Sequence, residues 1–417
     1  MRRPPGPAKR SLSGPKRGIA AILLATALLA GRSGAQSRED LLQRRLPTPG
    51  PSKALRSHIV PLPDELPLKV PSGFRVALFA AGLSMPREMA TLPSGRLLVV
   101  ESSGGRVREL ADRDADGRSD RKNVWADGFR RPYGILVHDG HVYVANTDSL
   151  VRFPIREDGT AGAKETVIPE LVFEGKPIGA GGHWTRDLVF SRDGKHLFLS
   201  VGSRSNVDAT GPKGRAAILR YAADGTEPRL YATGLRNPSA ITLRPGTDEI
   251  WVTVNERDNL GNDLVPDYTT RVTEGAFYGW PFYYIGANPD PRHSGKHPEL
   301  AETVVVPDVL IQSHSAPLGL AFYTGEGFPE HYRGGLFVGL HGSWNRKPII
   351  GYKVVFIPFR DGKPSGAPED FLTGFVADEA KGAVYGRPVT PYFAPDGSLL
   401  ISDDEAGRIW RVTWVGE

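Results

Sequence analysis

The sequence predicts an all-β protein, a six-bladed β-propeller with four-stranded antiparallel blades. The chain holds 49 glycines and 36 prolines in 417 residues, which favours turns and short strands over long helices. From residue 73 onward, six similar units follow one another, each with a Gly-rich entry and several short alternating apolar runs. Six units over about 345 residues give just under 60 residues each, enough for one four-stranded blade with insertions.

The units can be located by their entries and by their turns. They begin, in order, at Gly82, Gly128, Gly181, Gly234, His314 and Gly374. The turns "PSG", "HDG", "RDG" and "PDG" separate alternating runs, and Gly or Asp supplies the positive φ that a tight hairpin needs. A long aromatic-rich insertion, residues 256–312, follows the fourth unit, and loops of that length are usually functional or disordered. A pair of β-sandwiches would not explain six units in phase.

The N-terminal segment is typical of an export signal. Residues 1–35 combine a basic lead, the 12-residue apolar stretch 19–30 and a small-residue cleavage site after Ala35. Twelve apolar residues are fewer than the roughly 20 that a membrane-spanning helix needs, although a retained signal anchor is the alternative. We therefore expect a signal peptide (1–35), a linker (36–57) and a propeller domain (58–417), located in the periplasm or secreted, with no membrane span after signal removal.

The net charge argues against nucleic-acid binding. The formal charge of the chain is +5, but residues 1–35 hold seven Lys or Arg and no Asp or Glu. Removing them leaves about −2, so the basic character belongs to the leader. The chain has no cysteine, which excludes disulfides and zinc thiolates.

Polar residues recur where each unit enters its first strand. In a propeller these entries converge on one end of the central channel, so residues far apart in sequence would share one pocket. The candidates are Arg130, Arg131, Tyr133, His183, Trp184, Arg236, Asn237, His314 and Arg387. The alternative is that they line a wet channel without activity.

Seven motifs in one order carry a family resemblance: "GGHWTRDLVF", "GLRNPSAI", "NERDNLGNDLVPDY", "FYGWPF", "HSAPLGLAFY", "HGSWNR" and "PDGSLLISDD". Over residues 58–415 the chain resembles the soluble PQQ-dependent sugar dehydrogenases, in particular the glucose/sorbosone dehydrogenase branch. The resemblance implies a quinoprotein oxidoreductase that oxidises an aldose or sugar aldehyde, with PQQ as the hydride acceptor. It also implies a sugar substrate, a periplasmic electron acceptor and a monomer or homodimer.

The resemblance assigns roles to individual residues. His183 matches the family's catalytic histidine, and an imidazole suits the removal of a hydroxyl proton near neutral pH. The glycines before it leave room for a flat cofactor. Arg236 and Asn237 match the Arg-Asn pair at the quinone edge, where fixed donors stabilise negative charge on oxygen.

Further residues of the predicted cofactor site follow the family less closely. Arg387 matches one of two arginines that hold the cofactor carboxylates, and Trp184 joins the set beside His183. Arg346 is expected to replace a family lysine. Two positions depart from the glucose-dehydrogenase pattern: Gly182 stands where an acidic residue is common, and Val389 stands where the second arginine would fall.

Two calcium sites are predicted, on different grounds. The resemblance implies Ca²⁺ on the backbone oxygens of Glu256, Arg257 and Asp258, as a hard Lewis acid beside the quinone. Independently, "DRDADGRSD" has the opening spacing of an EF-hand loop. Its carboxylates are Asp112, Asp114, Asp116 and Asp120, and they form either a structural calcium site or a solvated acidic turn.

Two other function classes remain open from the sequence. The first is a non-catalytic periplasmic propeller that binds a carbohydrate or a protein. The second is a calcium-dependent lactonase, which would need several carboxylate side chains around one ion. The residues at the unit entries are arginines and histidines instead, so the lactonase is the least favoured of the three function classes. The fingerprints of serine hydrolases, P-loop NTPases and NAD-binding enzymes do not occur.

Overall fold

The computed structural model describes residues 1, 2, 4, 6, 46–208 and 211–416. Strands dominate these residues, and the helical elements among them are three short 3₁₀ turns, η1 (Pro291–His293), η2 (Pro298–Thr303) and η3 (Glu330–Tyr332). The predicted signal peptide and the first part of the predicted linker lie mostly outside the described residues. Within the described part of the chain, no helix has the length and apolar character that a membrane crossing requires.

Six four-stranded antiparallel sheets make up most of the described chain. Sheet 1 contains β3 (Pro86–Thr91), β4 (Leu97–Glu101), β5 (Arg106–Ala111) and β6 (Arg121–Asp127). Sheet 2 contains β7 (Ile135–His138), β8 (His141–Ala145), β9 (Leu150–Pro154) and β10 (Glu165–Ile168). Sheet 3 contains β13 (Leu188–Phe190), β14 (His196–Val201), β15 (Ala217–Ala222) and β16 (Arg229–Thr233).

The remaining three sheets follow the same plan. Sheet 4 contains β17 (Pro238–Leu243), β18 (Ile250–Val254), β19 (Asp267–Val272) and β22 (Val309–Ile311). Sheet 5 contains β23 (Pro317–Phe322), β24 (Leu336–Leu340), β25 (Lys353–Ile357) and β28 (Glu369–Leu372). Sheet 6 contains β31 (Pro388–Phe393), β32 (Leu399–Asp403), β33 (Arg408–Trp414) and, from the start of the domain, β2 (Phe74–Ala81). The predicted four-stranded antiparallel units are confirmed.

The smaller sheets sit in the connections. Two-stranded pairs are β11 (Val172–Phe173) with β12 (Lys176–Pro177), β20 (Tyr283–Tyr284) with β21 (Asn288–Pro289), and β26 (Phe359–Arg360) with β27 (Lys363–Pro364). A three-stranded sheet joins β1 (His58–Ile59), β30 (Ala383–Val384) and β29 (Val376–Asp378).

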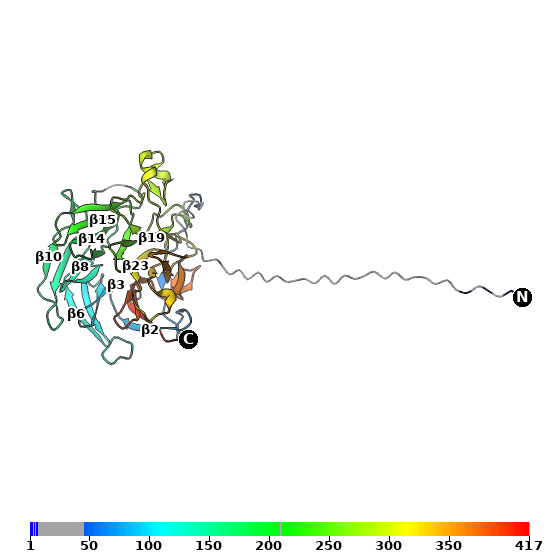
Figure 1. The fold of residues 1–417 in the computed structure, drawn as a ribbon, viewed down its shortest axis with the longest axis horizontal. Coiled ribbons are helices and arrows are strands. Elements are labelled where there is room, and N and C mark those ends of the chain that lie inside the picture. Colours follow the sequence, from blue (N-terminus) through cyan, green and yellow to red (C-terminus); the bar gives the residue numbers. More distant parts are fainter. Residues whose placement is uncertain (3, 5, 7–45, 209–210, 417) are drawn as a thin grey trace. The chain divides into compact units, whose positions relative to one another are not determined.

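The first strands of the six sheets contact one another in sequence. β3 contacts β7, β7 contacts β13, β13 contacts β17, β17 contacts β23, β23 contacts β31, and β31 contacts β3. In Figure 1, β3 and β23 lie near the middle of the described domain, and β6 and β10 lie toward its edge. The loops that enter these first strands are therefore brought together.

Burial explains why the second strands are almost purely apolar. Every residue of β4, β18, β24 and β32 is buried, because another sheet packs on each face. One hydrophobic cluster joins Phe198 and Ile218 of sheet 3 to Val252 of sheet 4. A continuous apolar run is the pattern expected of strands buried on both faces.

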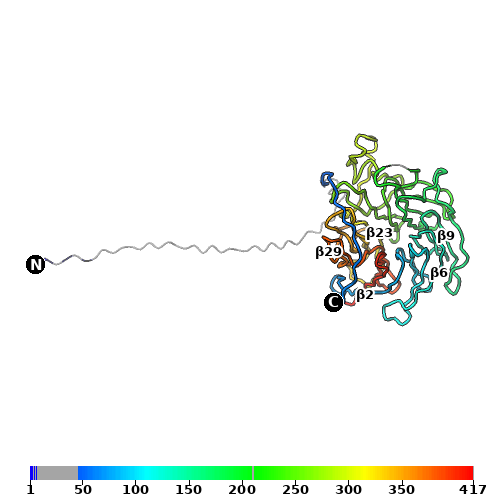
Figure 2. Tube along the Cα trace, turned by 180° about the vertical axis from the view of Figure 1, so that it is seen from behind, coloured from blue at the N-terminus to red at the C-terminus, as the bar shows by residue number. Residues whose placement is uncertain are grey.

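Two sets of long-range hydrogen bonds tie distant parts of the described chain together. Tyr133, fully buried at the entry of sheet 2, donates its hydroxyl to the Leu318 carbonyl of sheet 5 at 2.6 Å. Residues 46–60 run over the connections of later sheets, as the blue segment in Figure 2 shows. Their backbone amides bond there, for example Gly50 to the Leu260 carbonyl at 3.0 Å and Leu55 to the Trp344 carbonyl at 2.9 Å.

Candidate functional site

The loop before β13 needs glycine at one position for two reasons. Gly182 has φ +64°, in the left-handed region that side chains other than glycine rarely adopt. A Cβ built there would lie 2.5 Å from the Arg204 Cα. An acidic side chain, which the family pattern led us to consider at this position, has no room on this backbone.

Two arginines fix the same loop by donating hydrogen bonds to its backbone carbonyls. Arg215 donates to the carbonyls of Ile178, Ala180, Gly181 and His183 and also to that of Ser203. Arg186 is fully buried and donates to the carbonyls of Ile178, Gly179, His183 and Thr185. These bonds satisfy the carbonyls of a glycine-rich segment that has no strand partner, so the loop keeps one shape.

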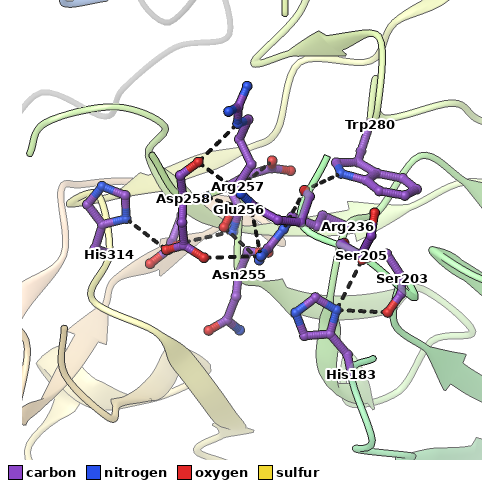
Figure 3. A network of polar contacts seen from close by, with 12 residues as sticks. His183, Ser203, Ser205, Arg236, Asn255, Glu256, Arg257, Asp258, Trp280 and His314 are labelled. Carbon is purple, nitrogen blue, oxygen red and sulfur yellow. Dashed lines mark hydrogen bonds and ion pairs between the residues drawn. The ribbon is translucent and has the colours of Figure 1, made fainter. Parts of the chain in front are cut away.

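The hydrogen bonds of His183 determine its tautomer. Its Nδ1 lies 3.0 Å from both the carbonyl and the hydroxyl oxygen of Ser203 (Figure 3). The Ser203 hydroxyl proton is directed to the Ser205 carbonyl at 2.6 Å, so the hydroxyl oxygen accepts from Nδ1. Both neighbours are thus acceptors, which places the proton on Nδ1 and leaves the lone pair on Nε2.

The surroundings keep this imidazole neutral. Burial, with the nearby Arg236 cation, lowers the pKa of His183 from its usual range to about 3. Both effects disfavour the imidazolium form. At pH 7 the half-buried ring therefore presents an unprotonated Nε2 that can accept a proton.

Arg236 is the centre of the polar network beside His183 (Figure 3). Its guanidinium donates to the carbonyls of Asn206, Asn255 and Glu256, to the Asn206 side chain, and to the Asp258 carboxylate at 3.1 Å. The Trp280 indole also donates to the Asn206 carbonyl at 3.0 Å. This network ties the end of sheet 3 to the insertion after β18.

Asn237, next to Arg236, has an unused side chain. Its amide makes no hydrogen bond to any described residue, and its Oδ1 is buried without a partner. A Cβ on the neighbouring Gly202 would lie 2.4 Å from that oxygen and 2.6 Å from the His183 Cβ. The glycine is what lets the amide and the imidazole lie close together.

Two of the three backbone oxygens predicted to bind calcium, those of Glu256 and Asp258, already accept hydrogen bonds. The Glu256 carbonyl accepts from Arg236 at 2.8 Å, and the Asp258 carbonyl accepts from Asn206 and from Arg257 at 3.1 Å each. Burial also raises the pKa of the Glu256 carboxyl to about 8, so it is neutral at pH 7. In this arrangement Arg236 provides the positive charge at the Glu256 carbonyl, and a calcium ion on that oxygen would compete with it.

The other predicted cofactor residues are held by the protein itself. Arg387 donates to the carbonyls of His341 and Gly342 and to the Glu405 carboxylate at 2.6 Å. Arg346 donates to the Asn262 carbonyl and to Asp263.

Aromatic and apolar surroundings complete this side. Trp184 lies under the Arg131 guanidinium at 4.1 Å and against Tyr133. Val389 is completely buried in β31, which leaves no place there for a second cofactor arginine.

Sequence reasoning missed a buried ionic cluster near Trp184. Arg87 pairs with Asp404 at 2.5 Å, and Asp404 accepts from the His341 Nε2 at 2.8 Å. The Arg87 guanidinium lies 5.4 Å from the Trp184 ring. His341 stands in the "HGSWNR" motif, which was the only signal for it.

Three of the four predicted EF-hand-like carboxylates do gather. One oxygen each of Asp112, Asp114 and Asp116 lies within 4.8 Å of the others. Asp120 instead pairs with Arg113 at 3.1 Å, and Asp112 also pairs with Arg411 at 3.3 Å. Calcium binding at this turn stays a prediction.

The chain was compared with known proteins. The family model "Glucose / Sorbosone dehydrogenase" matches residues 83–343, more than half of the chain, and a TrAA12-like model matches residues 288–415. An uncharacterised protein of Borreliella burgdorferi is 29% identical over 356 residues, covering 83% of this chain and 90% of that protein. The pyrroloquinoline quinone-dependent pyranose dehydrogenase of Coprinopsis cinerea is 27% identical over 83% of this chain, which spans about half (54%) of that enzyme.

Solved structures of similar proteins superpose on most of this chain. The holo PQQ domain of the Coprinopsis pyranose dehydrogenase superposes with a TM-score of 0.69 at 25% identity, covering 87% of this chain and all of that domain. The calcium structure of a Trichoderma reesei family AA12 enzyme has a TM-score of 0.71 at 20% identity over 89% of this chain and 98% of that one, a likeness of fold. The chain belongs to the glucose/sorbosone dehydrogenase family.

Proposed function

We propose that this protein is a PQQ-dependent sugar dehydrogenase that oxidises an aldose or a sugar aldehyde at C1. The observation that carries the proposal is the neutral His183, with Nε2 free, beside the unused amide of Asn237. The name of the Coprinopsis pyranose dehydrogenase, to which the chain is similar, supports the same chemistry. We further propose that the six sheets are the blades of one closed propeller, with β2 completing the last blade.

The residues present fit a carboxylated quinone in their donor chemistry. When bound, PQQ supplies an acceptor for the hydride that leaves the sugar carbon. His183 Nε2 takes the hydroxyl proton of the same carbon, so that the C–OH group becomes a carbonyl. Asn237 would hold a quinone oxygen through its free amide, and the Arg236 charge would stabilise negative charge on the cofactor.

The remaining residues predicted to bind the cofactor would first have to give up hydrogen bonds within the protein. Arg387 and Arg346 would have to exchange their protein acceptors for cofactor carboxylates, and a cofactor on the Trp184 ring would have to compete with Arg131. Calcium on the oxygens of Glu256, Arg257 and Asp258 would have to displace Arg236 from the Glu256 carbonyl. Calcium dependence is therefore tested separately from PQQ dependence.

Dye-coupled sugar oxidation tests the proposal directly. The purified protein is assayed alone, with PQQ, and with PQQ and calcium, against a panel of aldoses, with EDTA as a control for the metal. We expect turnover only with PQQ, together with a change in the PQQ absorbance on binding. If PQQ neither binds nor supports turnover on any sugar, the enzyme proposal fails, and a non-catalytic carbohydrate- or protein-binding role replaces it.

The cellular setting is proposed with the activity. We propose that the protein is exported to the periplasm or secreted, and passes its electrons to an acceptor there. Fractionation of producing cells, with N-terminal sequencing of the product, would show cleavage after Ala35. An uncleaved cytosolic product would contradict the proposed export but not the proposed sugar oxidation.

A further inference from the structure

A second pocket lies directly beside the His183 loop. Its volume is about 330 Å³, at the lower end of the roughly 300–1,000 Å³ typical of small-ligand sites. It is formed between sheet 3 and the insertion after β18, and six lining side chains define it: Arg204, Lys213, Arg215, Phe277, Trp280 and Phe282. We call it the insertion pocket.

The insertion pocket shares its walls with the candidate active site. The Arg204 backbone packs against Gly182, directly before His183, and Arg215 donates to the His183 carbonyl at 3.2 Å. The indole of Trp280 donates to the Asn206 carbonyl, which also accepts from Arg236 (Figure 3). A ligand in this pocket would therefore be adjacent to a sugar held at His183.

The charged side chains that line the insertion pocket are all basic. Arg204 is exposed and makes no hydrogen bond or ion pair with any other described residue. Lys213 is 71% exposed and meets Glu174 at 3.2 Å. No Asp or Glu among the described residues lines the pocket. An exposed guanidinium without a partner, on a rim of this kind, favours a carboxylate, which it can bind with two parallel hydrogen bonds.

The floor of the pocket is aromatic. Phe277 and Phe282 are partly exposed, while Trp280 is 9% exposed and fixed by its indole hydrogen bond. Rigid aromatic faces suit the apolar C–H face of a sugar ring, and polar groups at the rim then fix its orientation.

We propose that the insertion pocket binds a uronate unit of an acidic saccharide, next to the sugar that is oxidised. The inference rests on the proposed function for the identity of the ligand as a sugar. It makes the substrate class an acidic di- or oligosaccharide, with Arg204 as the residue that selects for charge.

Equilibrium binding to the protein without PQQ tests the pocket independently of catalysis. The probes are digalacturonate and the neutral digalactose, which differ in their carboxylates, and the readouts are calorimetry and tryptophan fluorescence. The variants are Arg204→Gln, Lys213→Gln and, as a matched control, Arg360→Gln. Arg360 is an exposed arginine of β26 whose side chain makes no hydrogen bond or ion pair to another described residue.

We expect digalacturonate to bind more tightly than digalactose, and added salt to weaken the difference. Arg204→Gln should weaken digalacturonate binding about tenfold, or about 1.4 kcal/mol, Lys213→Gln less, and Arg360→Gln not at all. Equal affinity for the two saccharides, equal binding of benzoate, or no effect of Arg204→Gln would overturn the proposal. If digalacturonate binds as expected but PQQ supports no turnover, the uronate site stands and the proposed enzyme activity fails. If PQQ supports turnover but digalacturonate does not bind as expected, the enzyme activity stands and the uronate site fails.

Discussion

His183 and His341 are two imidazoles near the entries of different sheets, and the protein treats them differently. Burial lowers the pKa of both, to about 3 for His183 and to about 4 for His341. His183 donates to neutral oxygens of Ser203, so its other nitrogen is free to take a proton. His341 donates to Asp404, a buried carboxylate whose pKa is held far below its usual range by Arg87 and His341 despite burial.

The difference shows what makes one histidine suited to catalysis and the other to structure. The His183 ring is fixed by a carbonyl and a hydroxyl, so protonation of its free nitrogen breaks no ion pair, although burial and Arg236 disfavour the protonated form. A ring fixed by a buried ion pair is part of a charge balance, and a change in any member leaves an uncompensated charge. We therefore expect loss of His183 to reduce activity and disruption of the His341 cluster to reduce stability.

Replacing His183 should have the largest effect. His183→Gln keeps a polar side chain but removes the base, and we expect the rate of sugar oxidation with PQQ to fall about 10²–10⁴-fold. The melting temperature should change little. His196→Gln, at an exposed position of β14, is the control and should retain full activity. A His183 variant that kept the wild-type rate would remove the base from the mechanism.

Breaking the ionic cluster should have the next largest effect. Asp404→Asn leaves the buried Arg87 cation without its counter-charge and His341 without its anionic acceptor, and we expect a loss of about 3–5 kcal/mol in the free energy of unfolding. Denaturant titration measures it. The exposed pair Arg229–Glu227 offers a matched control, since Glu227→Gln should cost at most about 1 kcal/mol. Equal effects of the two substitutions would contradict the contrast.

Acid should destabilise the fold through both rings. Each folded-state pKa, about 3 and about 4, lies below the unfolded value of about 6.5, so between these limits the unfolded chain binds more protons. The stabilising contribution is fully present above pH 6.5 and is lost as the pH falls toward 3. Unfolding free energies between pH 7 and pH 4 should fall less steeply in His183→Gln than in the wild type. Parallel curves would show that His183 is not held neutral.

Removing one of the two acceptors of the His183 ring should have a modest effect. Ser203→Ala leaves the Ser203 carbonyl in place, and the lost hydrogen bond should cost about 1 kcal/mol, a rate decrease of about fivefold. The decrease should be in kcat rather than in KM, because the ring is less firmly oriented. A loss as large as that of His183→Gln would mean that the hydroxyl itself reacts.

The last prediction is that kcat/KM does not depend on the ionisation of His183 near neutral pH. Because the pKa of His183 is about 3, kcat/KM should show no ionisation of this base between pH 5 and pH 8. A pH–rate profile of the wild type measures this, with Arg236→Gln as a comparison in which loss of the nearby cation raises the His183 pKa. A limb near pH 6.5 in the wild type would contradict the neutral-base interpretation.

The sequence by itself determined the β architecture and the location of the candidate base. Alternating runs and Gly or Asp turns act within a few residues, so the four-stranded units and the glycine-flanked His183 could be predicted from local pattern. The family motifs, in order, added the assignment that the family model confirms.

Only the tertiary structure decided what each polar side chain binds. Asn206 meets Asp258 across 52 residues, His341 meets Asp404 across 63, and Tyr133 meets the Leu318 carbonyl across 185. No local pattern encodes such partners, because they depend on which sheets become neighbours and on which carbonyls lack a strand partner. Burial and charge at those junctions then set the pKa of each imidazole, which is why we expect different roles for two similar histidines.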